Sequence, residues 1–64
     1  MLEEKKMSLP KDPVMLLSVV NTQLRDQYSS LEELAMAHGV PAEEIQNALR
    51  KINYEYNEEI NQFK

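Results

Sequence analysis

The chain contains no cysteine, one histidine and one glycine among its 64 residues. The absence of cysteine excludes disulfide bonds, thiolate metal sites and thiol nucleophiles. A single glycine, Gly39, excludes the glycine-rich loops that cradle phosphate groups. His38 has neither a companion metal ligand nor a nucleophile, so we expect it to lie at a helix end. A fold this small also has little room for a pocket, and we therefore expect no enzymatic activity and no cofactor.

Long apolar runs are missing as well. No run is longer than that of residues 14–17, which is far shorter than the roughly 20 residues of a membrane-spanning helix. Charged residues 3–6 are not followed by an apolar stretch before Pro10, so this N-terminus does not have the pattern of a secretory signal peptide. These two absences predict a cytoplasmic protein without a membrane partner.

The composition that remains is that of a small globular domain. Hydrophobic residues make up 42% of the chain, a value that argues against wholesale disorder. A chain of 64 residues without disulfides is near the size at which a single core is marginal, so it must pack well or self-associate. We expect one domain over residues 10–64, preceded by a flexible N-terminal segment over residues 1–9.

The first predicted helix has a clear start. Asp12 can cap it, and Pro13 suits the first helical position, where its missing N–H costs nothing. The pattern runs to Asp26 or Gln27. Apolar residues at helical spacing predict that one face is buried, consisting of Leu17, Val20, Leu24 and Tyr28. A second apolar strip lies beside it and consists of Met15, Leu16 and Val19.

Two shorter helices follow in the predicted structure. Either Ser30 with Glu33 or Ser29 with Glu32 has the spacing of a capping box, which predicts a helix over residues 31–38. Gly39 then supplies a residue that can adopt the left-handed conformation that ends many helices. A third helix is expected to start at Pro41, and its apolar stripe consists of Ile45, Ala48, Leu49 and Ile52.

The hydrophobic period changes to alternation after the third helix. Tyr54 and Tyr56 flank a glutamate, which is typical of a short strand. If residues 57–60 form a four-residue loop, Tyr56 faces Asn61 and Tyr54 faces Phe63. This register predicts a C-terminal hairpin whose aromatic side chains pack on the helices.

The predicted fold class is therefore mainly α, with a three-helix, helix-turn-helix-like bundle followed by a short C-terminal β-hairpin. This order resembles a reduced winged helix. The helix-turn-helix interpretation of residues 30–52 rests on a small residue, a turn glycine and two apolar residues for the corner between helices, namely Ala35, Gly39, Val40 and Ile45. The same packing also occurs in protein-interaction domains, so the motif alone does not predict DNA binding.

Charge argues against nucleic acid as a partner. The net charge is −4, and residues 30–52 and 53–64 each contribute −2 of it. Glu43 and Glu44 fall in the first turn of the third helix, where a DNA-reading helix approaches the bases, and they would repel phosphates there. Their structural role is to compensate the helix dipole.

Two stretches, one within residues 9–31 and one within residues 54–63, resemble a family of short bacterial proteins of unknown function, and the likeness covers essentially all of residues 9–63. The resemblance is carried by residues 9–21, 24–26, 28–31, 54–57 and 61–63, with an L-P-K-D-P-V-M-L-L-S-V-V-N opening and a Y-E-Y-N and N-Q-F ending. The resemblance implies a stand-alone small bacterial domain, and it implies that residues 1–6 are peripheral to that domain. It brings no activity, cofactor or site residue with it.

Two functions from different classes remain after these exclusions. The favoured hypothesis is a small non-enzymatic interaction or adaptor domain that binds protein, either a second copy of itself or another chain. Its candidate interface is the apolar strip of Met15, Leu16 and Val19, because three short elements can bury only part of the first helix. The alternative is a weak DNA-associated regulator that uses the helix-turn-helix of residues 30–52.

Overall fold

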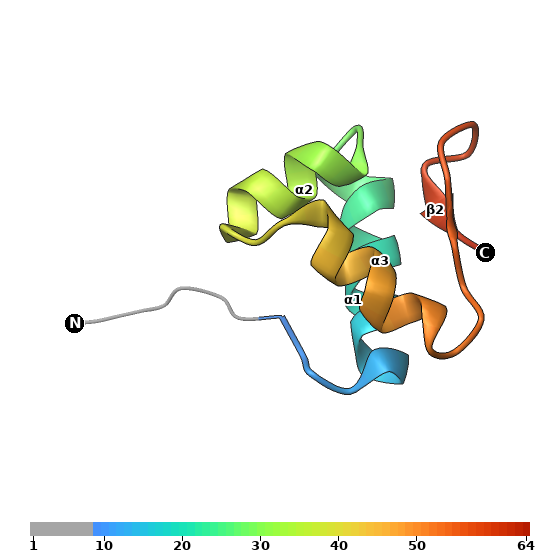
Figure 1. Cartoon of the computed structure of the whole chain (residues 1–64). Coiled ribbons are helices and arrows are strands. Elements are labelled where there is room, and N and C mark those ends of the chain that lie inside the picture. Colours follow the sequence, from blue (N-terminus) through green and yellow to red (C-terminus); the bar gives the residue numbers. More distant parts are fainter. Residues whose placement is uncertain (1–8) are drawn as a thin grey trace.

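Three helices and a C-terminal hairpin follow one another along residues 9–64, the part of the chain that the computed structural model describes (Figure 1). The elements are α1 (Pro13–Asp26), α2 (Leu31–His38), α3 (Ala42–Arg50), β1 (Tyr56–Asn57) and β2 (Gln62–Phe63). The predicted mainly helical fold with a terminal hairpin is thus confirmed. Residues 1–8 of the expected N-terminal segment lie outside the described residues, and Leu9 is half-buried against the core.

The start of α1 follows the predicted capping. The Asp12 carboxylate accepts a hydrogen bond from the Val14 N–H at 3.1 Å, and Pro13 is the first helical residue. The buried face of α1 differs from the prediction, because Leu16 is buried and Leu17 is only half-buried. Leu16 and Leu24 share one face with Val20, at successive spacings of four residues, and this row faces the other helices.

The cap of α2 uses one of the two predicted pairs. Ser30 Oγ accepts from the Glu33 N–H at 3.1 Å, whereas Glu32 has no such role. The Glu33 carboxylate returns to Ser29 and accepts from both its N–H and its hydroxyl, at 3.2 and 2.9 Å. At the other end, Gly39 has a φ of 70°, the left-handed conformation expected of it. Helix α2 is therefore capped at both ends by hydrogen bonds between residues close in the sequence.

Replacing Ser30 with alanine is expected to lower the free energy of unfolding by about 1 kcal/mol, because one N–H at the start of α2 loses its acceptor. Ser18→Ala is the matched control, since Ser18 is exposed in the middle of α1. Urea denaturation followed by circular dichroism measures both variants. Equal losses for the two substitutions would contradict the capping role.

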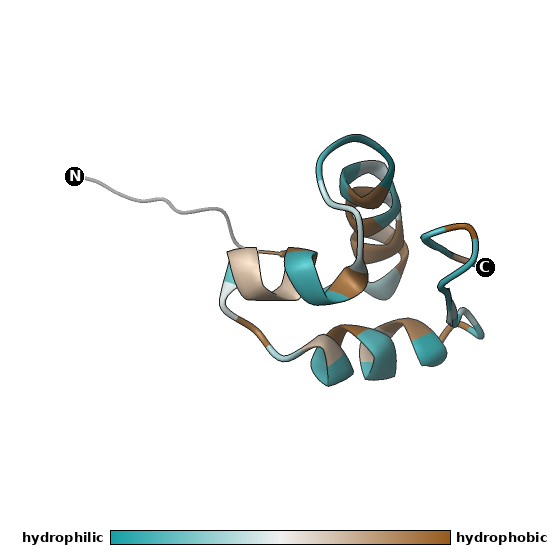
Figure 2. Ribbon diagram, turned by 90° about the horizontal axis from the view of Figure 1, so that it is seen from above, coloured by the Kyte–Doolittle hydropathy of each residue, from teal (hydrophilic) through white to brown (hydrophobic). Residues whose placement is uncertain are grey.

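The third helix begins without a side-chain cap. Pro41 occupies the capping position, and α3 starts one residue later, at Ala42. Glu43 and Glu44 lie in its first turn, where their charges compensate the helix dipole. In Figure 2 the hydrophobic residues of α3 lie toward the other helices and its hydrophilic residues face outward. Ile45 and Leu49 make up the buried part of this stripe.

One hydrophobic core holds these elements together. It combines residues from all three helices with the last aromatic of the chain, namely Leu16, Val20, Leu24, Leu31, Leu34, Ala35, Ile45, Leu49 and Phe63. Leu34, Leu49 and Val20 are fully buried. The corner residue Val40 and the stripe residue Ile52 pack against this core from its edge, as expected.

The hairpin has a different register from the predicted one. Tyr56 pairs with Phe63, and Asn57 pairs with Gln62, so the four-residue turn is 58–61 and not 57–60. Asn61 belongs to the turn because its φ is 54°, a left-handed value that asparagine tolerates better than most residues. The prediction failed because it treated Asn61 as a strand residue.

In this register the aromatic side chains of the C-terminal segment do not all pack together. Tyr56 and Phe63 pack together, with ring centroids 5.5 Å apart. Tyr54, by contrast, remains 36% exposed and is not part of the buried cluster. The expected group of three packed aromatics is therefore reduced to two.

Candidate functional site

The candidate interface on α1 is only partly at the surface. Met15 is 58% exposed and Val19 is half-buried, whereas Leu16 lies in the core. Leu16 is therefore removed from the candidate surface, because exposing it would require opening the core. Sequence reasoning missed Val14, which is 63% exposed beside Met15 in the first turn of α1. The apolar surface of this helix is thus concentrated at its N-terminal end.

A hydrogen-bonded latch joins the hairpin to α1. The Asn21 side chain accepts from the Phe63 N–H at 2.7 Å and donates to the Phe63 carbonyl at 3.1 Å. This amide replaces the main chain of a neighbouring strand and satisfies the outer edge of β2. Gln62 adds to the latch, since its side-chain amide donates to the Asn21 carbonyl at 3.0 Å. We call Asn21, Tyr56, Asn61 and Gln62 the hairpin latch below.

Asn61 connects the hairpin turn to the end of α1. Its side-chain amide donates to the carbonyls of Leu24 and Tyr28, at 2.9 and 3.0 Å. Its side-chain oxygen accepts from the Tyr56 hydroxyl at 2.6 Å, and that hydroxyl accepts from the Leu31 N–H at 3.3 Å. One asparagine therefore satisfies one carbonyl in the last turn of α1 and one just beyond that helix, and through Tyr56 it reaches the start of α2. All four latch residues lie in the two stretches that carried the resemblance, and each has a structural role.

His38 also has a structural partner. Its Nε2–H donates to the side-chain oxygen of the buried Gln23 at 2.8 Å. Its ring packs edge-on against Tyr28, with centroids 6.4 Å apart. The bond satisfies an amide oxygen in the core, so the lone histidine holds the end of α2 against α1. Ser29 and Ser30 bond to Glu33 and not to this imidazole.

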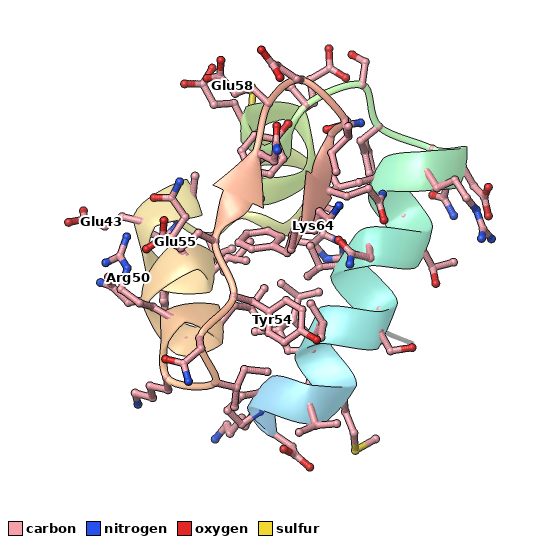
Figure 3. All side chains as sticks on the ribbon, turned by 90° about the vertical axis from the view of Figure 1, so that its right-hand side faces the viewer. Glu43, Arg50, Tyr54, Glu55, Glu58 and Lys64 are labelled. Atoms are coloured by element: carbon pink, nitrogen blue, oxygen red, sulfur yellow. The ribbon has the colours of Figure 1, made fainter. Side chains whose placement is uncertain are left out.

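Both arginines of residues 9–64 lie next to carboxylates. Arg25 is paired with Asp26 at 3.0 Å, and the side-chain hydrogen bond from Arg25 holds the pKa of the Asp26 carboxyl below its usual range. Arg50 donates to Asn47 at 3.1 Å and lies 3.9 Å from Glu55. Glutamates outnumber cations on the face formed by α3 and the hairpin, where Figure 3 labels Glu43, Arg50, Glu55, Glu58 and Lys64. This distribution opposes the approach of a phosphate backbone.

An open groove of about 460 Å³ lies between β1 and the N-terminal ends of α2 and α3. Its lining consists of Ser29, Ser30, Leu31, Glu32, Ala42, Gln46, Tyr56 and Glu58. Two of these residues are glutamates and none is a lysine or arginine. Sequence reasoning missed this groove because its residues come from three separate segments. We call it the β1 groove.

Within residues 9–64, no three histidine, aspartate or glutamate side chains are grouped so that they could hold a metal ion. None of the helices described above has the length and apolar composition needed to span a bilayer.

Comparison with known proteins places the chain in a family without an assigned activity. No curated protein and no solved structure matches the chain. A family model described as "Domain of unknown function (DUF4250)" matches residues 10–63, from the opening stretch of the resemblance to its ending. The expected resemblance to a family of unknown function is thereby confirmed. The chain belongs to the DUF4250 family.

Proposed function

We propose that this domain is a small protein-interaction module that self-associates through the first two turns of α1. The observation that carries the proposal is the exposure of Val14 and Met15, at 63% and 58%, on adjacent positions of a capped helix. Neighbouring exposed apolar side chains gain free energy when a partner covers them. Val19 lies one turn from Met15 on the same side of α1, so it extends this surface.

The proposal is tested by the oligomeric state of the Met15→Lys variant. We expect sedimentation equilibrium of the wild-type protein to show a concentration-dependent dimer, and Met15→Lys to weaken it at least about tenfold, because a charge would be buried at the contact. Met36→Lys is the matched control, since Met36 is 79% exposed on α2, away from this surface. A wild-type protein that remains monomeric at millimolar concentration would refute self-association.

A DNA-associated role is the second candidate, and one observation favours it. The sequence α2, a turn at Gly39, and α3 has the order of a helix-turn-helix. The charges of this helix-turn-helix oppose DNA binding, since Glu43 and Glu44 are exposed in the first turn of α3. Fluorescence anisotropy with random duplex DNA at low salt separates the two functions. Saturable binding that weakens steeply with salt would favour the DNA role over the interaction module.

A further inference from the structure

The two edges of the hairpin differ in a way that the sequence does not show. The outer edge of β2 is covered, because the Asn21 side chain forms hydrogen bonds with both the N–H and the carbonyl of Phe63. On β1, the Glu55 carbonyl accepts from the Lys64 N–H at 2.9 Å, and Asn57 pairs with Gln62. Tyr56, between these two pairs, directs its own N–H and carbonyl away from β2. Within residues 9–64, no hydrogen bond uses either main-chain group of Tyr56.

Tyr56, whose main chain forms this free edge, is also one of the residues that line the β1 groove. Tyr56 and Glu58 line it from the hairpin, and Glu32 lines it from the first turn of α2. Both glutamates are exposed, and among residues 9–64 no cation shares the lining, so the groove attracts positive charge. Leu31 and Ala42 are the aliphatic residues of the same lining. The groove is only partly enclosed, which suits a segment of chain better than a fully buried small molecule.

We propose that the free edge of β1 and the β1 groove bind an extended, basic peptide segment of another protein. The segment adds to the hairpin as a third strand, with hydrogen bonds to the main chain of Tyr56. Lysine or arginine side chains at alternate positions face Glu32 and Glu58, because the side chains of a strand alternate between its two faces. This surface is separate from the apolar turns of α1, so it does not depend on self-association.

The charges of β1 exclude a second copy of the domain as the occupant. Pairing two β1 edges would bring Glu55 and Glu58 of one chain close to the same residues of the other. Like charges opposite each other across strands are destabilising. Glutamates next to a free edge therefore prevent self-pairing and leave the edge available to a segment of opposite charge. The same acids repel the phosphates of a nucleic acid.

The test uses the ¹⁵N-labelled full chain and a blocked hexapeptide, acetyl-Lys-Thr-Lys-Val-Lys-Thr-amide. We expect chemical-shift changes at the amides of residues 29–32 and 56–58, and slower hydrogen exchange at the Tyr56 N–H. Two control peptides separate charge from strand pairing. One replaces each lysine with glutamate, and the other carries N-methyl groups at alternate residues, which remove the edge hydrogen bonds. Neither control is expected to bind measurably.

A pair of neighbouring substitutions tests the site itself. Glu58→Lys is expected to weaken binding of the lysine peptide about tenfold, since it places a cation in the groove. Glu59→Lys makes the same change one residue along the exposed turn, outside the groove lining, and is expected to weaken binding less than about threefold. Equal effects of the two variants, equal binding of the N-methylated peptide, shift changes confined to α1, or no binding would each overturn the proposal.

Discussion

Replacing Asn21 with leucine is expected to release the hairpin from α1 and to lower the free energy of unfolding by about 2–4 kcal/mol. The leucine side chain fills a similar volume and favours the helix, but it can neither donate to nor accept from Phe63. The main-chain N–H and carbonyl of Phe63, a residue that is 2% exposed, would then lose their partners in a partly buried position. Urea denaturation measures the loss, and hydrogen exchange at the Phe63 amide reports whether the hairpin opens first.

Thr22→Leu is the matched control for this substitution. Thr22 lies next to Asn21 on α1 but is exposed, so the same leucine removes no latch bond there. We expect its free energy of unfolding to change by less than about 0.5 kcal/mol. If both leucine variants lost the same stability, or if Phe63 kept its slow exchange in Asn21→Leu, the latch would not be what holds the hairpin.

Replacing Leu34 with alanine is expected to cost about 2–5 kcal/mol, the second large effect. Leu34 is fully buried in α2, and its truncation leaves a cavity between the helices. A folded domain of 64 residues has a total stability of roughly 3–10 kcal/mol, so this single cavity removes a large part of it. Thermal unfolding followed by circular dichroism measures the loss, with sucrose added to both proteins if the variant is partly unfolded at room temperature.

Met36→Ala provides the comparison on the same helix. Met36 is 79% exposed two residues after Leu34, so truncating it removes few contacts. We expect a change of less than about 0.5 kcal/mol. A loss in Met36→Ala as large as that in Leu34→Ala would mean that α2 packs through its other face.

The hairpin latch gives four residues of the family resemblance a structural role. Asn21, Tyr56, Asn61 and Gln62 are prominent residues of the two stretches that carried the resemblance, and all of them hold the hairpin in place. The surfaces that we propose for binding use other side chains, chiefly Met15 on α1 and Glu58 beside the β1 groove. Substitutions at latch residues therefore report on folding, and tests of binding belong at the exposed positions.

Local sequence signals determined the helical part of this protein. Asp12 with Pro13, Ser30 with Glu33, and Gly39 each act within four residues along the chain, and each has the predicted role. Such capping signals can be predicted from the sequence because both partners of each capping interaction lie within one helical turn. The charges of Glu43 and Glu44 are equally local, since both residues lie in the first turn of one helix.

Only the tertiary structure decided the register of the hairpin, the buried face of α1 and the position of the β1 groove. Leu16 and Leu17 are equivalent in an apolar pattern, and the packing of the other helices selects Leu16 for the core. Asn61 is held in the turn by the carbonyls of Tyr28 and Leu24, which lie 33 and 37 residues away in the sequence. The physical reason is the same in each case. These choices depend on hydrogen bonds and contacts between distant segments, whose partners a linear pattern cannot identify.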